Sequence, residues 1–128
     1  QQELDLVSKK KVQFNFTPHL TPMFRGILST IYFTVNKGYN TKSIISSLKK
    51  FYKNDIYIKI AKKNSLISTN DVINTNRCLI SVCESRSKNQ LIILSAIDNL
   101  IKGGSGQAIQ NLNLMFNFNK NMGLKWDT

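Results

Sequence analysis

Several residue types that often define a function are scarce in this chain of 128 residues. Histidine occurs once, cysteine and proline occur twice each, and acidic residues occur only seven times. No Cys-x-x-Cys pair is present, and two cysteines cannot build a disulfide framework, so we expect reduced thiols. The few histidine, cysteine and acidic residues show no spacing typical of a metal site or a catalytic carboxylate pair, and we predict no bound metal.

Long apolar runs and targeting signals are also missing. No run approaches the roughly 18 residues that cross a membrane, and the first five residues have neither the charged nor the apolar region of a signal peptide. We therefore expect a cytoplasmic protein with no membrane partner. The chain also starts without a methionine, and we interpret it as a piece of a longer protein.

Positive charge is what the sequence has in excess. The formal net charge is +11, and Lys9-Lys10-Lys11 is the longest basic run. Such a charge suits a basic nucleic-acid-binding module, but a general bias toward Lys, Asn and Ile on a solvated surface is the favoured explanation. The aromatic residues that could stack on bases are interpreted instead as core-facing: Phe14, Phe16, Phe33 and Phe51. Nucleic acid is therefore an unlikely partner.

The spacing of apolar residues predicts one domain with both strands and helices. Strands are predicted at residues 12–16, 26–35, 56–60, 77–83 and 90–97. Thr41 is the predicted N-cap of a helix, and the residues expected on its inner face are Ile44, Ile45, Leu48, Phe51 and Tyr52. A second helix is predicted at residues 105–116, with one apolar face made of Ile109, Leu112, Met115 and Phe116.

These elements do not alternate as simple βαβ units. The fold class predicted from their order is α+β, with a mixed, largely antiparallel sheet and helices on one of its faces.

The single histidine lies in a candidate catalytic segment. His19 is flanked by Pro18 and Pro22, which hold the segment rigid, and Arg25 follows six positions later. Histidine suits acid–base chemistry near neutral pH, and arginine can hold a carboxylate or a phosphate with two hydrogen bonds. The spacing alone is weak evidence, because a solitary histidine is more often a structural or surface residue.

A glycine-rich turn is the second candidate. The sequence Lys102-Gly103-Gly104-Ser105-Gly106-Gln107 directly precedes the predicted second helix. Glycines let a ligand approach the backbone, and the first turn of a helix favours an anion. The spacing is not that of a P-loop. The alternative interpretation is an ordinary turn in which Ser105 is the N-cap.

The two cysteines are interpreted as structural. Cys78 and Cys83 lie five positions apart in one predicted strand, which puts them on opposite faces. An apolar strand does not provide the electropositive niche that a reactive thiolate needs.

The two candidate segments resemble one enzyme family. Residues 17–30 resemble the His-x-x-Pro-Met-x-Arg-Gly-Ile-Leu-x-Thr stretch of N-acetyl-γ-glutamyl-phosphate reductases, and residues 95–116 resemble that family's Asp-Asn-Leu-x-Lys-Gly segment with the helix that follows. Both matches are ungapped. Gln2-Glu3-Leu4 resembles the residues that precede the first match, so the similarity extends over nearly the whole chain.

This resemblance implies a two-domain enzyme, with an N-terminal Rossmann domain for NADP and an α+β domain for catalysis and subunit contact. Residues 1–97 would belong to the α+β domain. Residues 98–128 would be the glycine-rich turn and a C-terminal helix that packs on the Rossmann domain, which this chain lacks. The resemblance also implies a homo-oligomer and a small-molecule acyl phosphate as substrate.

The resemblance implies a role for each matched residue. In such enzymes a cysteine thiolate forms a thioester with the substrate, and hydride passes from the nicotinamide. His19 would be the general base and acid, and Arg25 would hold the carboxylate or the phosphate of the substrate. Asn99 would face the nicotinamide, and the residues expected against the cofactor are Gly103, Gly104 and Gly106.

The chain departs from the family pattern in two ways. The family's nucleophile lies upstream, in a Gly-Cys-Tyr-Pro-Thr type motif that is absent here, so this chain alone is expected to be inactive. Ile73 and Asn74 replace an Arg-Gly pair of the family. The motifs also fit a sister enzyme of lysine biosynthesis, which reduces an acyl phosphate on an acidic carrier protein.

Overall fold

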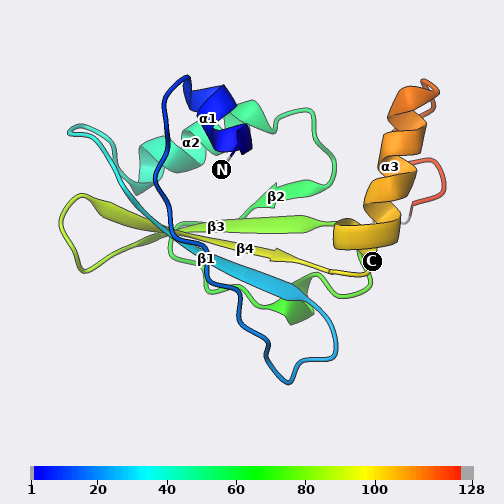
Figure 1. The fold of residues 1–128 in the computed structure, drawn as a ribbon, viewed down its shortest axis with the longest axis horizontal. Helices are drawn as coiled ribbons and strands as arrows, with labels where there is room; N and C mark the ends of the chain where they lie inside the picture. Colours follow the sequence, from blue (N-terminus) through cyan, green and yellow to red (C-terminus); the bar gives the residue numbers. More distant parts are fainter. Residues whose placement is uncertain (1, 125–128) are drawn as a thin grey trace.

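The computed structural model describes residues 2–124, which form one four-stranded sheet. The strands are β1 (Ile27–Thr34), β2 (Ile58–Ile60), β3 (Cys78–Glu84) and β4 (Gln90–Ile97). Their order in the sheet is β1-β4-β3-β2 (Figure 1). β4 runs antiparallel to both β1 and β3, whereas β2 runs parallel to β3. The predicted α+β class with a mixed, largely antiparallel sheet is confirmed.

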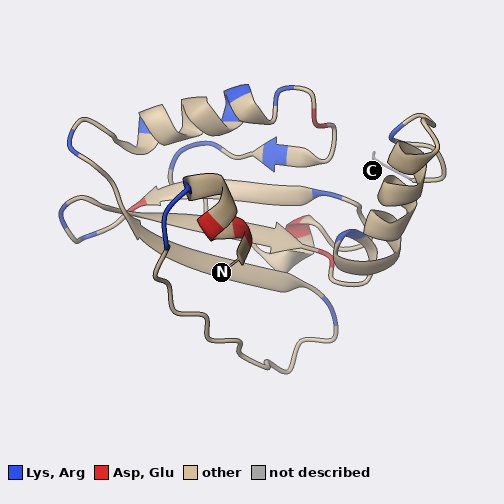
Figure 2. Cartoon of the chain, turned by 45° about the horizontal axis from the view of Figure 1, so that its top comes forward, with Lys and Arg blue, Asp and Glu red and all other residues tan. Residues whose placement is uncertain are grey.

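The helical segments surround this sheet. They are α1 (Gln2–Ser8), α2 (Thr41–Phe51), η1 (Thr69–Asp71), η2 (Ile101–Ser105) and α3 (Gly106–Met115). α2 contacts β2 and β3 on one side of the sheet, whereas the segment with η1 passes across the other side and contacts β4 (Figures 1 and 2). α3 stands beyond the end of the sheet where β4 finishes. The last four residues of the predicted C-terminal portion, 125–128, lie outside the described residues.

Helix α2 begins one residue earlier than predicted. Asn40, not Thr41, is its N-cap: the Asn40 side chain accepts a hydrogen bond from the backbone N–H of Ser43, and the Ser43 hydroxyl accepts one from the N–H of Asn40. This reciprocal pair is a capping box. Four of the predicted inner-face residues are half-buried, but Phe51, at the last position of the helix, is 80% exposed.

The strand predicted at residues 12–16 does not form. Residues 10–26 are irregular, and Phe14 and Phe16 are exposed. Alternating apolar residues make a strand only where a neighbouring strand supplies the hydrogen-bond ladder. In the described sheet β1 pairs with β4, and residues 12–16 pair with none of the four strands. The interpretation of Phe14, Phe16 and Phe51 as core residues is therefore wrong.

Part of the core lies on the two central strands, and Tyr57 and Val72 in the connecting segments complete it. Val82 and Ala96 are fully buried, and Ile80 and Leu91 are nearly so. Edge strand β1 is far less covered, and the large apolar side chains exposed along it are Ile27, Leu28, Ile31 and Tyr32. Among the described helices, none is both long enough and apolar enough to cross a membrane.

Candidate active site

The entry to β1 is fixed by Gly26. Its φ is +108°, a conformation that residues with a side chain rarely adopt. A Cβ added there would lie 2.5 Å from Cβ of Thr69 in η1, which is closer than real atoms approach. The absence of a side chain at Gly26 thus lets η1 pack directly on the backbone where the irregular segment joins the sheet.

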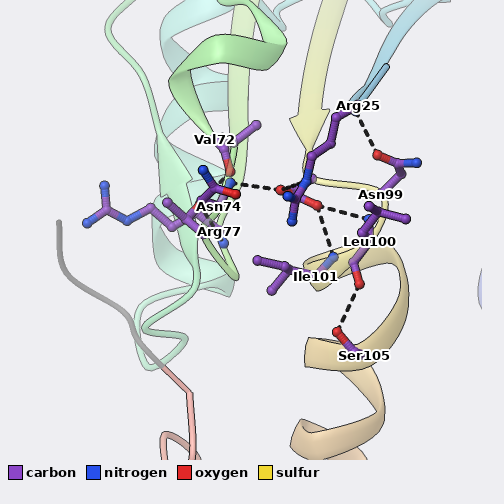
Figure 3. A network of polar contacts seen from close by, with 11 residues as sticks. Arg25, Val72, Asn74, Arg77, Asn99, Leu100, Ile101 and Ser105 are labelled. Atoms are coloured by element: carbon purple, nitrogen blue, oxygen red, sulfur yellow. Dashed lines mark hydrogen bonds and ion pairs between the residues drawn. The ribbon is translucent and has the colours of Figure 1, made fainter. Parts of the chain in front are cut away.

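Asp98 is the residue that organises this end of the sheet. It follows β4 directly and is fully buried. Its Oδ1 accepts hydrogen bonds from the N–H groups of Leu100 and Ile101, both at 2.9 Å. Its Oδ2 accepts one from the N–H of Asn74 at 2.8 Å and forms an ion pair with Nε of Arg25 at 2.7 Å (Figure 3). One carboxylate therefore joins three segments that are distant in the sequence.

The environment of Asp98 favours its charged form. Burial acts to raise the pKa of the carboxyl group. The hydrogen bonds from Ile101, Asn74, Leu100 and Arg25 act in the other direction and outweigh it, so the net effect is a lowered pKa. Asp98 is accordingly an anion at neutral pH, held by three backbone donors and one guanidinium.

Asn99 makes a second bond across the same junction. Its Oδ1 accepts a hydrogen bond from the N–H of Gly26 at 2.7 Å. Because Ile27 pairs with Ile97 at the end of the ladder, these contacts extend the β1–β4 pairing beyond the sheet. Two consecutive residues after β4 thus hold the two consecutive residues before β1, and the two predicted motifs meet.

The glycine-rich turn is built on the residues that follow. Residues 101–105 form a short helical segment that is kinked at Gly104, whose φ of −144° and ψ of −107° are not helical, and the segment runs into α3. The N–H of Gly103 donates to the carbonyl of Asp98 at 2.9 Å. Both the N–H and the hydroxyl of Ser105 donate to the carbonyl of Leu100, at 3.0 and 2.9 Å. Ser105 therefore closes this turn. It stands at the predicted N-cap position directly before α3, but its side chain makes no capping bond.

The three candidate glycines have different surroundings. Gly103 and Gly104 are exposed, whereas Gly106 is buried. A Cβ added at Gly106 would overlap Oδ1 of Asn76 and lie 2.8 Å from Ile101 Cγ2. Gly106 thus has a packing role within the chain, and the backbone of Gly103 and Gly104 is open to a ligand.

His19 makes no polar contact with the residues of this junction within residues 2–124. It is exposed on the irregular segment, and its Nδ1 is 3.2 Å from the carbonyl oxygen of Thr17. Within residues 2–124, no hydrogen bond or ion pair joins His19 to Arg25, Asn99 or the glycine turn. The structure therefore brings together Arg25, Asn99 and the turn, but not His19.

A second polar cluster supports the base of α3. Oε1 of Gln110 accepts hydrogen bonds from Nζ of Lys102 at 2.6 Å and from Nδ2 of buried Asn76 at 2.9 Å. The Lys102 ammonium also lies 5.5 Å from the ring centre of buried Tyr57. Burial lowers the pKa of Lys102, and the charge of Asp55 opposes that shift. The cluster holds the turn against the start of β3, and no spacing in the sequence pointed to it.

Both cysteines are free, half-buried and on opposite faces of β3, as predicted. Cys78 Sγ lies 3.5 Å from the hydroxyl of Ser95, and Cys83 Sγ lies 3.8 Å from the carbonyl of Ser65. In the described part of the chain, no three His, Cys, Asp or Glu residues gather closely enough to hold a metal ion.

Sequence analysis assigned no role to Asp98, although it is the best-connected side chain of the junction. The available signal was its position, since a lone carboxylate stands directly between the apolar strand 90–97 and a glycine-rich turn. A charge at that boundary is buried only when it is paired.

Comparison with known proteins fits this architecture. The chain belongs to the family described as "Semialdehyde dehydrogenase, dimerisation domain", whose profile matches residues 1–99. Curated proteins named N-acetyl-gamma-glutamyl-phosphate reductase match almost the whole chain. The resemblance that the two motifs indicated is confirmed.

Three relatives illustrate the match. The protein of Thermoanaerobacter pseudethanolicus (strain ATCC 33223 / 39E) is 43% identical over 97% of this chain. That of Vesicomyosocius okutanii subsp. Calyptogena okutanii (strain HA) is 46% identical, and that of Staphylococcus aureus (strain MRSA252) is 40% identical, each over 98% of the chain. The chain spans only 35–36% of the length of these relatives.

Proposed function

We propose that this chain supplies the proton-transfer residue, the substrate-binding arginine and the cofactor-facing turn of an NADP-dependent N-acetyl-γ-glutamyl-phosphate reductase. The observation that carries the proposal is the junction in which Asp98 and Asn99 join the His19–Gly26 motif to the glycine turn. The identity of 40–46% to reductases of that name supports it.

Arg25 and His19 would act on the substrate. The ion pair to Asp98 involves Nε of Arg25, which leaves the two terminal nitrogens of the guanidinium for a carboxylate or a phosphate. His19 would accept the proton of the attacking thiol and return a proton when the thiolate leaves. The cysteine that forms the thioester would come from the part of the enzyme outside this chain, because Cys78 and Cys83 lie within β3.

The glycine turn fits one wall of a dinucleotide site. Bound NADPH would supply the hydride. The exposed backbone of Gly103 and Gly104 allows close approach of a flat cofactor, and Asn99 holds the turn beside Arg25 through its bond to Gly26. Gly106 would act indirectly, by letting α3 pack closely on Asn76.

The missing Rossmann domain would cover the apolar surface of α3. Leu112, Met115 and Phe116 are between 48% and 77% exposed, and a helix with such a surface normally packs against another element. The family description as a dimerisation domain supports self-association of the whole enzyme. We therefore propose a homo-oligomer in which each subunit combines both domains.

The proposal is tested with the full-length enzyme by following NADPH oxidation with N-acetylglutamyl phosphate. His19→Ala is expected to lower kcat by about 10²–10⁴-fold, the usual contribution of a general acid–base group. Gln13→Ala, an exposed polar change on the same segment, is the matched control and should leave kcat unchanged. An unchanged rate in His19→Ala would reject the assigned role. The 128-residue chain alone should show no activity until the rest of the enzyme is added.

The basic surface gives a reason to test a carrier-linked substrate as well. Figure 2 shows Lys and Arg spread over α2, β2 and several connecting segments, and the net charge is +11. Such a field would attract an acidic carrier protein. A higher kcat/KM with carrier-linked than with free acyl phosphate would assign the enzyme to that substrate.

A further inference from the structure

We propose that Asp98 is a positioning residue that couples the substrate-binding arginine to the cofactor-facing turn. The inference rests on the proposed function and adds to it a residue that touches neither substrate nor cofactor. Its basis is that one buried carboxylate makes direct contacts with both parts of the site.

The first contact orients Arg25. An arginine side chain has several rotatable bonds, and ordering it when a substrate binds lowers the affinity. Here Nε is already held at 2.7 Å from Oδ2, and the side chain is only 22% exposed. The guanidinium is therefore ordered in advance, and its orientation depends on Asp98.

The second set of contacts shapes the turn. The carboxylate accepts from the N–H groups of Leu100 and Ile101, and the Asp98 carbonyl accepts from Gly103. The side chain and the main chain of one residue therefore fix the start of the turn. A shift of Asp98 would displace both Arg25 and Gly103.

The side chain at position 98 must be a carboxylate, and an asparagine of the same shape would not replace it. Four donors converge on the two oxygens, from Arg25, Asn74, Leu100 and Ile101. An asparagine in the same place would present its NH₂ group to at least one pair of these donors. The NH₂ group, itself a donor, would then face N–H donors in place of an acceptor, and either Arg25 or the glycine turn would move.

The test measures kcat and KM in the full-length enzyme. Asp98→Asn is expected to lower kcat/KM for the acyl phosphate by about 10- to 100-fold, because small misplacements of binding groups cost that much. Asp98→Glu should recover part of the loss, since it keeps the charge. Asp71→Asn is the matched control: Asp71 also accepts a backbone hydrogen bond, from Ser68 at 2.7 Å, but it is exposed, and within residues 2–124 no hydrogen bond or ion pair joins it to Arg25 or the glycine turn.

A double-variant cycle separates positioning from general support of the fold. If Asp98 acts through Arg25, adding Asp98→Asn to Arg25→Lys should lower kcat/KM for the acyl phosphate little further. Fully multiplicative effects, or wild-type kinetics in folded Asp98→Asn, would overturn the inference. If the wild-type enzyme does not oxidise NADPH with the acyl phosphate, the proposed function fails instead.

A second measurement covers the case in which Asp98→Asn does not fold. Hydrogen exchange at the Leu100 and Ile101 amides, compared between wild type and Arg25→Lys, reports on the coupling directly. Faster exchange at these amides in Arg25→Lys is expected, because Asp98 then loses its ion-pair geometry. Unchanged exchange at both amides would contradict a link between Arg25 and the turn.

Discussion

The two ends of the His19–Gly26 stretch differ in how the chain holds them. At one end, Arg25 and Gly26 are tied to Asp98, Asn99 and η1. At the other end, His19 is exposed, and the polar contact found for it among residues 2–124 is with the carbonyl of Thr17 two residues away. The anchored end is held by contacts from distant segments, whereas the contact found for the histidine end in residues 2–124 is local.

This difference separates residues that a domain can position alone from residues that need further structure. Arg25 is oriented by groups of its own domain. If His19 is catalytic as proposed, it would instead gain its geometry from a nucleophile, substrate and cofactor that the proposal places outside this chain. Substitutions at the anchored end should therefore change stability, and substitutions at the other end should change only activity.

The largest expected effect is at Asp98. Replacing Asp98 with Ala should lower the free energy of unfolding of the 128-residue chain by roughly 3–5 kcal/mol, since it removes one partner of a buried ion pair and leaves three N–H groups without an acceptor. Urea denaturation followed by circular dichroism measures this. Asp71→Ala is the control and should cost about 1 kcal/mol, as loss of a cap does. Equal effects of the two variants would show that the buried Asp98 carboxylate stabilises the anchored end no more than an exposed capping residue does.

Gly26 comes second. Gly26→Ala combines a positive φ with a Cβ that would overlap Thr69, and we expect a loss of about 2–4 kcal/mol from strain and crowding together. Gly38→Ala isolates the backbone strain, because Gly38 has a φ of +94° but nothing within 4 Å of an added Cβ. It should cost about 1–2 kcal/mol. If thermal unfolding gave the same loss for both, η1 would not be packed on Gly26.

Acid should loosen the anchored end through Asp98. Its pKa is lowered in the folded state, so the unfolded state binds the proton more tightly, with a pKa of about 3.9. The stabilisation is therefore complete above about pH 5 and is lost as the pH falls through 3.9 toward the folded-state value. Denaturation between pH 3 and 6 should show this decline in wild type and a weaker one in Asp98→Asn. Parallel curves would exclude Asp98 as the source.

Much of the framework could be predicted from the sequence because it depends on local patterns. Strand 90–97 was predicted with its observed bounds, since it is a continuous apolar run between polar turns. The prediction of a strand at residues 12–16 was wrong, because an alternating pattern does not show whether a partner strand lies beside it. The prediction of Phe51 as a core residue was wrong, because Phe51 is the last residue of α2 and is 80% exposed.

The sequence predicted which segments form the candidate site, but not which residues in them contact one another. The motifs pointed to Arg25, Asn99 and the glycines, and the structure brings these segments together. The role of Asp98 depends on a bond to Asn74, 24 residues away, and on the fold of the turn. The family resemblance assigned Gly106 to the cofactor site, whereas the structure packs Gly106 closely on Asn76, and this contact depends on the path of α3. Such contacts follow only from tertiary structure.

The smallest expected effect is at His19. His19→Ala should change the unfolding free energy of the 128-residue chain by less than about 0.5 kcal/mol, because the side chain is exposed and its contact with Thr17 is local. The same urea titration that detects Asp98→Ala measures it. Together with a large loss of kcat in the whole enzyme, this result would establish that His19 serves catalysis and not the fold. A destabilisation comparable to Asp98→Ala would instead mean that the histidine end is anchored by contacts of its own.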